Sequence, residues 1–333
     1  MGSPQPTIDI LLATYNGEKY LREQIESIRY QTYDNWRLLI SDDCSSDNTL
    51  DIIKNYVEMD SRIALISESR HFGSAKENFF HLLQHSTGSL VMFCDQDDVW
   101  LDDKIEVSLK EMEHAGGTED SSLPTVVFTD SIVVDEDLQV LSYSYHKYAN
   151  RHPYCCEYKR LLITNTAAGN TMMLNLPLVR LLQDVKHPSA VCMHDWFAML
   201  VASAFGKIVY TPIPTVLYRQ HGSNAVGAVK STLSSKVLHR LNSKKDAEKV
   251  NRLNEESKAA AQAAFFAETY ATLLSDKLYT ETMEYVKAIN ADRLSPAVAS
   301  LIKSGCWKPG LLPKIGQILH RYEYCKEIAA HRR

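Results

Sequence analysis

From Ile8 to Val140 the chain alternates apolar runs with amphipathic segments, and this alternation constrains its fold more than any other feature. Apolar runs of strand length lie at residues 8–13, 36–40, 63–66, 90–94 and 125–128. Segments with helical spacing lie between them, at 20–29, 49–57, 75–84 and 102–113. Such alternation is typical of a mostly parallel sheet covered by helices on both faces. The sequence therefore predicts an α/β fold whose ligands bind beyond the carboxyl ends of the strands.

Polar side chains follow three of these predicted strands. The three sets are Thr14-Tyr15-Asn16-Gly17, Ser41-Asp42-Asp43 and Asp95-Gln96-Asp97-Asp98. Because parallel strands end at the same rim of a sheet, we expect the three sets to converge there. No GxGxxG follows the first strand and no GxxxxGK[ST] occurs, which counts against a dinucleotide dehydrogenase and a P-loop enzyme.

The third set contains three carboxylates, Asp95, Asp97 and Asp98, directly after a buried strand. Such carboxylates repel one another, so a positive group is expected among them. Hard oxygen ligands suit Mg²⁺ or Mn²⁺, and such an ion commonly completes its shell with substrate phosphates. The segment Asp135-Glu136-Asp137 has similar spacing but lies between apolar runs, which is typical of a solvated hairpin turn. The pattern of residues 90–100 therefore favours an enzyme that handles a nucleoside diphosphate.

Composition indicates an ordinary globular chain of one large domain, or of one domain plus an appendage. No run of about 18 apolar residues and no basic-then-apolar leader occurs, so no membrane span or signal peptide is expected. Seven cysteines without regular spacing favour free thiols in a reducing compartment, and hence a cytoplasmic location.

The net charge of −5 is unevenly distributed. Residues 229–333 contain 18 Lys/Arg and 11 Asp/Glu, which leaves residues 1–228 with a net charge of −12. Beyond Gly222 the composition changes to Ala, Lys, Leu and Glu with helical spacing, and helices are expected at 259–274 and 311–325. We therefore predict a catalytic domain over residues 1–225 and a helical region over 226–333.

The role of this helical region stays open at the level of sequence. The basic residues Lys314, Arg321 and Lys326 flank an apolar stripe at Leu311, Ile315 and Leu319, with Ile318 and Tyr322 on the same face. An interfacial helix docked on an anionic membrane has this pattern. The same stripe would also suit packing on the chain's own domain or a homodimer.

Four segments, in order, resemble the family-2 glycosyltransferases of the GT-A fold over roughly residues 7–225. Ala13-Thr14-Tyr15-Asn16-Gly17 and Leu39-Ile40-Ser41-Asp42-Asp43-Cys44-Ser45-Ser46-Asp47 resemble the family's first two nucleotide-contacting strand ends. Cys94-Asp95-Gln96-Asp97-Asp98-Val99-Trp100 resembles its metal motif, in the form associated with bacterial rhamnosyltransferases. Tyr218-Arg219-Gln220-His221-Gly222-Ser223-Asn224 is similar to the segment that follows the catalytic region in that subgroup.

The resemblance implies roles for these residues. The implied nucleotide-sugar contacts are Thr14, Tyr15, Asn16, Asp95, Gln96, Arg219 and one of Asp42 and Asp43, with Tyr15 near the nucleobase. The implied ligands of Mg²⁺ or Mn²⁺ are Asp97 and Asp95, and His221 would either ligate the metal or bond the leaving diphosphate. Asp98 would orient either Asp97 or Asp95, with capping of the following helix as its alternative. A structural role is the alternative for His221.

The family also uses a carboxylate base at a helix start, and His194-Asp195-Trp196-Phe197 resembles that position. Asp195 would then accept the proton of the acceptor hydroxyl. Its alternative is N-cap of a helix over 196–204. The resemblance leaves the role of His194 open, and Trp100 and Trp196 are candidates for lining the acceptor pocket, with core packing as the alternative.

We therefore expect an inverting glycosyltransferase that moves L-rhamnose from dTDP-β-L-rhamnose to a polyprenyl-linked surface glycan, with no nucleic-acid partner. The same fold with a UDP-hexose donor is one alternative. A non-catalytic nucleotide-sugar-binding or scaffold protein is a second, and the carboxylate set counts against it. A sugar nucleotidyltransferase would need a Gly-rich basic loop after the first strand, which this chain lacks.

Overall fold

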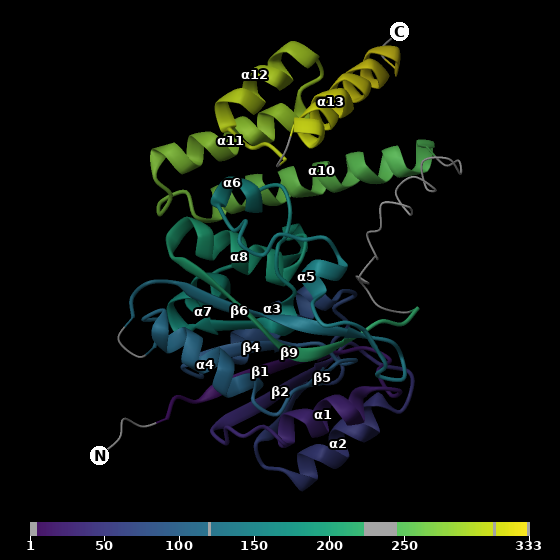
Figure 1. Cartoon of the computed structure of the whole chain (residues 1–333), viewed down its shortest axis with the longest axis vertical. Coiled ribbons are helices and arrows are strands. Elements are labelled where there is room, and N and C mark those ends of the chain that lie inside the picture. The colour runs from purple at the N-terminus through teal and green to yellow at the C-terminus, as the bar shows by residue number, and fades with distance from the viewer. Residues whose placement is uncertain (1–4, 119–120, 223–244, 309–310, 332–333) are drawn as a thin grey trace. The chain divides into compact units, whose positions relative to one another are not determined.

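The computed structural model describes residues 5–118, 121–222, 245–308 and 311–331. Contacts divide the chain into two units. The first is Met1–Tyr154 with Thr166–Ser189 and Met193–Ser231, and the second is Cys155–Asn165 with Ala190–Cys192 and Thr232–Arg333. The predicted boundary at residue 225 falls outside the described residues. Figure 1 shows the sheet of the first unit and the helices α10 to α13 of the second.

The described residues of the first unit form one nine-stranded sheet, ordered β3-β2-β1-β4-β8-β6-β9-β5, with β7 paired to β6. Its strands are β1 (Ile8–Thr14), β2 (Trp36–Asp42), β3 (Ile63–Ser67), β4 (Leu90–Cys94), β5 (Val99–Trp100), β6 (Thr125–Val134), β7 (Val140–Ser142), β8 (Met172–Asn175) and β9 (Lys207–Arg219). Strands β1 to β4 are parallel, as predicted. Strand β8 runs antiparallel to both β4 and β6, so the sheet as a whole is mixed.

Helices cover both faces of this sheet, which confirms the predicted fold class. They are α1 (Leu21–Arg29), α2 (Thr49–Met59) and α4 (Lys104–His114) on one face, and α3 (Ala75–His85), α7 (Leu176–Gln183) and α8 (His194–Phe205) on the other. Three shorter pieces, α5 (Tyr145–Tyr148), η1 (Gly169–Thr171) and η2 (Pro188–Ala190), lie in the connections. The Asp135–Asp137 segment joins β6 to β7 as the predicted hairpin turn.

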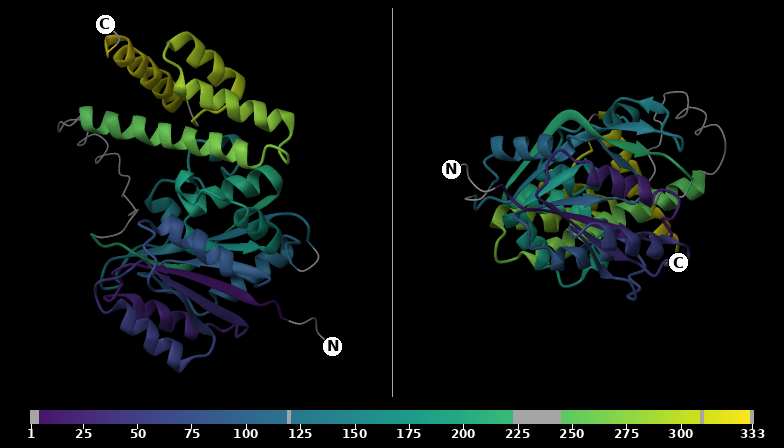
Figure 2. Two further views of the ribbon diagram at one scale, coloured as in Figure 1. Left: turned by 180° about the vertical axis from the view of Figure 1, so that it is seen from behind. Right: turned by 90° about the horizontal axis from the view of Figure 1, so that it is seen from below.

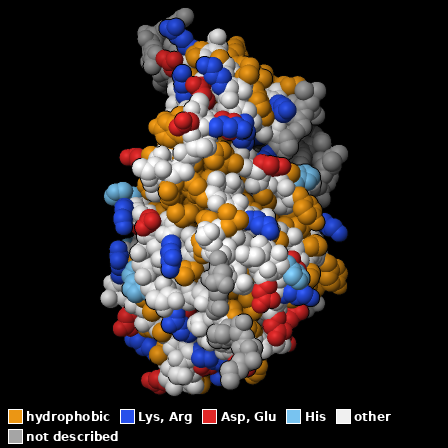
Figure 3. All heavy atoms as spheres, turned by 90° about the vertical axis from the view of Figure 1, so that its left-hand side faces the viewer, with side chains coloured by type: hydrophobic (Ala, Val, Ile, Leu, Met, Phe, Trp, Pro, Cys, Tyr) orange, Lys and Arg blue, Asp and Glu red, His pale blue; other side chains and the backbone are white. Residues whose placement is uncertain are grey.

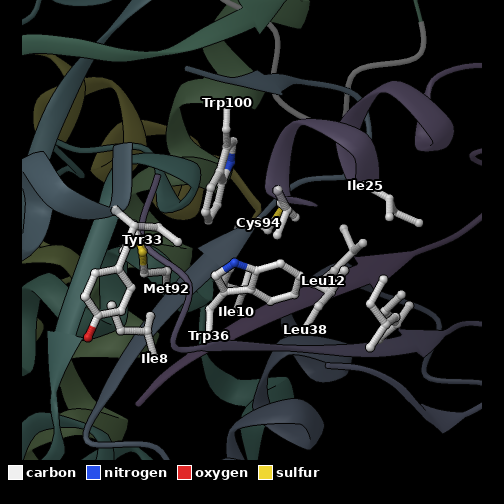
Figure 4. Packing of buried hydrophobic residues seen from close by; sticks show 14 of the residues in the cluster. Ile8, Ile10, Leu12, Ile25, Tyr33, Trp36, Leu38, Met92, Cys94 and Trp100 are labelled. Carbon is white, nitrogen blue, oxygen red and sulfur yellow. The ribbon is translucent and has the colours of Figure 1, made fainter. Parts of the chain in front are cut away.

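Residue alternation along β1 builds the core beneath α1, α2 and α4. Ile8, Ile10 and Leu12 point to one face because successive strand residues alternate sides. They pack with Trp36 and Trp100, each 1% exposed, and Figure 4 shows this cluster from close by. Burial of such large apolar side chains is the main favourable term in folding.

The second unit is helical, as the sequence predicts. It contains α6 (Tyr158–Leu161), α10 (Lys245–Thr269), α11 (Asp276–Asn290), α12 (Leu294–Ser304) and α13 (Leu311–His331), with α10 to α13 drawn green to yellow in Figure 2. A buried ion pair joins two of them, since Arg321 Nη2 lies 2.8 Å from Glu256 Oε2. Arg321 Nη1 also donates to the Ile289 carbonyl at 2.6 Å.

This ion pair corrects one prediction about α13. Arg321 is fully buried, because its guanidinium satisfies Glu256 and a helix-end carbonyl, and therefore it does not flank an exposed stripe. Ile315, Leu319 and Tyr322 are exposed, at 44%, 54% and 50%. Among the described residues, no helix has the length and apolar character needed to cross a membrane. On the face drawn in Figure 3, side chains of both charges are interspersed with apolar ones.

Candidate active site

The three polar strand ends meet at one rim of the first unit's sheet. Strand β1 lies between β2 and β4, with Thr14 opposite Asp42 and Leu12 opposite Cys94. The loops after these parallel strands therefore leave the sheet side by side, as the sequence predicts. A ligand at this rim would meet all three loops at once.

Gln96 fastens the loop after β4 to the loop after β1. Its Oε1 accepts from Tyr15 N at 2.8 Å, and its Nε2 donates to Tyr15 O at 3.0 Å. A Cβ at Gly17 would lie 2.5 Å from Gln96 Oε1, so any larger residue there would displace the Gln96 side chain from these bonds. The ring of Tyr15 is 54% exposed, so it is available to a ligand while its backbone is held.

Hydroxyl and amide side chains fasten the loop after β1 to the loop after β2 in the same way. Asn16 N donates to Ser45 Oγ, and Asn16 Oδ1 accepts from Ser46 N, both at 2.8 Å. Asn16 and Cys44 have left-handed backbone conformations, with φ of 48° and 58°. These two bends at non-glycine residues are held by cross-loop hydrogen bonds, as backbone strain at functional sites commonly is.

Asp42 and Asp43 both accept hydrogen bonds from other groups of the protein. Asp42 is fully buried and accepts from Thr14 Oγ1 at 2.8 Å and from Ser45 N at 2.7 Å. Asp43 keeps 6% exposure and accepts from the backbone N–H groups of Phe72 and Gly73. Of the two, Asp43 is therefore the carboxylate that a nucleoside could reach.

The carboxylates after β4 crowd one another and Asp195. Burial raises the pKa of Asp95 to about 7, and the charges of Asp97 and Asp195 add to the effect. The predicted base, from α8, and the predicted metal ligands, from the loop after β4, thus lie in one electrostatic field. A divalent cation or a bound proton would relieve this repulsion.

His221 contacts Asp97 directly. Its Nε2 lies 2.8 Å from Asp97 Oδ2, and its ring packs against Tyr20 with the centroids 4.8 Å apart. Two of the three predicted metal ligands are therefore in contact. Among the described residues, no three His, Cys, Asp or Glu side chains are arranged to hold a metal ion by themselves. The donor set fits a hard cation that draws further ligands from a diphosphate.

Asp98 lies beneath this loop and is fully buried. Its Oδ1 accepts from Arg219 N at 3.0 Å, and its Oδ2 accepts from the side-chain amide of Asn170. Burial raises the pKa of Asp98, with Asp97 and Asp95 adding to the rise. Asp98 therefore joins the carboxylate loop to β9 and η1. It does not cap the next helix, which was its alternative role, since the N-cap of α4 is Asp103.

Arg219 is 2% exposed and its guanidinium is committed to the protein. Nε donates to Asp97 O at 2.9 Å, Nη1 donates to Glu136 O at 2.6 Å, and Nη2 pairs with Glu23. These contacts support a role in holding the backbone of the loop that carries Asp95 and Asp97. The implied contact of Arg219 with the nucleotide sugar stays a prediction.

Asp195 lies in the first turn of α8, whose N-cap is Met193. Its Oδ1 accepts from Trp196 N at 2.6 Å. Gly169 of η1 packs against the same turn, because a Cβ there would lie 2.8 Å from His194 Nε2 and 3.3 Å from Asp195 Cβ. Since the next residue, Asn170, bonds Asp98, η1 positions Asp195 relative to the carboxylate loop.

The three candidate acceptor residues lie in different surroundings. His194 is 5% exposed and stacks on Phe79 at 3.9 Å, and burial lowers its pKa to about 3. Among the described residues, its two ring nitrogens have no hydrogen-bond partner. Trp100 belongs to the core of Figure 4. Trp196 is partly exposed beside Asp195, so it alone of the three is placed where an acceptor could contact it.

Several residues at the site carry no motif that the sequence analysis used. They are Asn170, Glu23, Asp130 and Tyr145. The only available signal was the polar segment Gly169-Asn170-Thr171 in an irregular region. Their contacts join residues far apart in the sequence, which spacing alone does not encode.

The fold places the chain in a class of proteins, the glycosyltransferases of the GT-A fold. The model of the family "Glycosyl transferase family 2" matches residues 9–128. The dTDP-rhamnosyl transferase RfbG of Shigella flexneri is 30% identical over 232 residues, which cover 65% of this chain and 74% of that protein. The chain therefore belongs to the family-2 glycosyltransferases.

Two further comparisons place the chain more broadly. The glucosyltransferase WfgD of Escherichia coli, whose full name is UDP-Glc:alpha-D-GlcNAc-diphosphoundecaprenol beta-1,3-glucosyltransferase, is 35% identical over 105 residues, which cover 32% of this chain and 40% of WfgD. The structure of S. aureus TarS 1–349 in complex with UDP has a TM-score of 0.53 at 14% identity, and the match covers 98% of this chain and 91% of that one. At that identity the likeness shows the fold alone.

The contact of η1 with α8 predicts the effect of Gly169→Ala. The added Cβ must push against His194 and Asp195, so we expect sugar transfer to fall about 10- to 100-fold, since small misplacements of reacting groups are costly. Donor turnover and the thermal midpoint would be measured together. Gly316→Ala is the matched control, because a Cβ there meets nothing within 4 Å. A folded Gly169→Ala protein with unchanged turnover would contradict this positioning role.

The raised pKa of Asp95 predicts how pH affects cation binding. A carboxyl group with a pKa of about 7 gains a proton as the pH falls, and the proton competes with a cation. Lowering the pH from 8 to 6 should weaken Mn²⁺ binding about tenfold, measured by calorimetry in the presence of dTDP. Asp95→Asn should remove this dependence, whereas His221→Gln should keep it. The reverse pattern would contradict the assignment to Asp95.

Proposed function

We propose that this family-2 glycosyltransferase is metal-dependent and inverting, and that it moves L-rhamnose from dTDP-β-L-rhamnose to a hydroxyl of a polyprenyl-linked glycan. The observation that carries the proposal is the shared electrostatic field of Asp95, Asp97 and Asp195. In this shared field, the proposed site for a diphosphate-bound cation would lie near the proposed carboxylate base. A protein that only binds nucleotide sugars needs no such base.

The proposed reaction assigns Asp195 as the base. The acceptor hydroxyl oxygen attacks the anomeric carbon, its proton passes to Asp195, and the bond to the dTDP oxygen breaks. Attack opposite the leaving group inverts the anomeric centre, so a β-linked donor would give an α-linked rhamnoside. Asp195 is 8% exposed beside the carboxylate loop, which keeps bulk water largely away from it.

Asp97 and Asp95 are the proposed ligands of Mg²⁺ or Mn²⁺, and His221 completes or orients the set through its contact with Asp97. When bound, the cation would supply charge stabilisation for the leaving diphosphate. Gln96 and Asp98 would keep the two ligand-bearing residues in place, because both tie the loop to neighbouring elements.

The donor assignment rests on RfbG, named as a dTDP-rhamnosyl transferase, which matches this chain over 232 residues. The relative WfgD is named for UDP-glucose and a diphosphoundecaprenol acceptor. Its name supports a lipid-linked acceptor and keeps a UDP-hexose donor as the second candidate. Both fit a role in assembling surface polysaccharides on the cytoplasmic side of the membrane.

Turnover of a donor panel tests this proposal. The panel consists of dTDP-rhamnose, UDP-glucose, UDP-galactose, UDP-GlcNAc and GDP-mannose. Each donor would be incubated with crude lipid-linked acceptors and with Mg²⁺, Mn²⁺ or EDTA. We expect metal-dependent turnover of dTDP-rhamnose, reduced about 10²-fold or more in Asp97→Asn and in Asp195→Asn, because each variant loses a charge needed in the transition state.

Asp137→Asn is the control for both variants, since Asp137 belongs to the exposed β6–β7 turn. Turnover of a UDP-sugar alone would keep the mechanism and overturn the rhamnose assignment. Nucleotide-sugar binding that is insensitive to EDTA, with no turnover of any donor, would favour a binding or scaffold protein.

We also propose that α13 docks the protein on the anionic inner leaflet. Ile315, Leu319 and Tyr322 present exposed apolar groups along this helix, and Lys314 and Lys326 are exposed on it as well. An apolar stripe bordered by lysines suits a lipid–water interface. The same stripe in a homodimer is the competing explanation.

Sedimentation with vesicles separates these two explanations. We expect co-sedimentation with phosphatidylglycerol vesicles at low salt, weaker at high salt because the charges are screened, and lost in Leu319→Ser. Ser300→Ala serves as the control, because Ser300 is buried in α12. A concentration-dependent dimer without vesicle binding would instead assign the stripe to self-association.

A further inference from the structure

Beside Asp195 lies a pair of tyrosine rings that the proposed chemistry does not use. Tyr145, on α5, and Tyr218, on β9, pack edge to face with ring centroids 5.5 Å apart and planes at 90°. Both rings are partly buried. Tyrosine offers a rigid apolar face and a polar hydroxyl, a combination common at binding surfaces.

Tyr145 lies in the electrostatic field of the proposed base, and Tyr218 lies in that of the carboxylate loop. Tyr145 is close enough to Asp195 for that carboxylate to raise the pKa of its phenol, after the larger effect of burial. Tyr218 lies in the fields of Asp98, Tyr145 and Asp95, and burial again has the largest effect on its pKa. The next residue in the chain, Arg219, bonds Asp98 through its backbone N–H. A molecule lying on this pair would be near both the proposed base and the carboxylate loop.

A buried carboxylate fixes Tyr145 in this place. Asp130, 4% exposed, accepts from Tyr145 N at 3.0 Å, from Ser144 Oγ at 2.5 Å and from Tyr210 Oη at 3.3 Å. Holding a buried carboxylate is costly unless its oxygens are bonded. One bond comes from α5, one comes from Ser144 directly before it, and one comes from Tyr210 on β9, the strand that carries Tyr218. These bonds hold the four-residue helix in place through its backbone and Ser144. The Tyr145 hydroxyl is therefore available to a ligand.

The Tyr145 hydroxyl makes no hydrogen bond with any residue in the part of the chain that the structure describes. The guanidinium of Arg151 lies 5.9 Å from the centre of its ring. A pyranose has an apolar C–H face, which packs on aromatic rings, and hydroxyls that bond a phenol or a guanidinium. We infer that Tyr145 and Tyr218 form the acceptor-sugar subsite, with Tyr145 directing the reacting hydroxyl toward Asp195. This inference rests on the proposed function, because it assigns a saccharide acceptor to the same site.

Saturation-transfer NMR tests this subsite without any donor. The probes are the octyl β-glycosides of glucose, galactose, N-acetylglucosamine and rhamnose, each added to the whole protein. We expect at least one glycoside to receive saturation on its sugar-ring protons. Tyr145→Ala should reduce that signal at least about fivefold, because the stacking surface is lost. Tyr145→Phe keeps the ring and should retain most of the signal.

Tyr143→Ala is the matched control, because this neighbouring tyrosine is 76% exposed and its loss should leave the signal unchanged. Circular dichroism would confirm that each variant is folded. The inference is overturned if no glycoside is saturated, if saturation reaches only the octyl chain, or if Tyr145→Ala retains the full signal. If the proposed function is wrong, donor turnover will be absent. The saturation-transfer result can still be interpreted, because it uses no donor.

Discussion

The site depends on one buried carboxylate, Asp98. It accepts the backbone N–H of Arg219 and the side-chain amide of Asn170, and so ties β9 and η1 to the loop that carries Asp95 and Asp97. Arg219 adds a second tie to the same loop through Asp97 O. A buried carboxylate that lost these donors would be left unpaired, which is strongly destabilising. The loop that carries Asp95 and Asp97 is therefore held in place by residues that need not touch any substrate.

The chemistry at the rim follows from how the loops are joined. Hydrogen bonds of Gln96 and Asn16 connect three loops whose strands are neighbours in the sheet, so the rim is held in one arrangement before any ligand binds. The functional carboxylates Asp95, Asp97 and Asp195 repel one another within this frame. Holding like charges together costs stability, and it is common at active sites because a bound cation or a transferred proton relieves it.

Much of the site could be predicted because it follows strand ends. Thr14, Asp42 and Asp95 come directly after apolar runs, and parallel strands bring such ends together wherever they stand in the chain. The position of Asp195 relative to Asp95 could not be predicted from spacing, since η1 sets it through Gly169 and Asn170. The inward orientation of Arg321 was missed for a similar reason: its partner Glu256 is 65 residues away.

The sequence by itself determined the α/β architecture, the helical character of the second unit and the family, because periodicity and short motifs are local properties of the chain. Only the tertiary structure decided which polar residues are enclosed by the protein and which keep an exposed surface. Asp42, Arg219 and His194 are enclosed, whereas Tyr15, Trp196 and Tyr145 keep part of their surface exposed. Burial and hydrogen bonding of a side chain depend on neighbours distant in sequence, and these exist only once the sheet and its helices have packed.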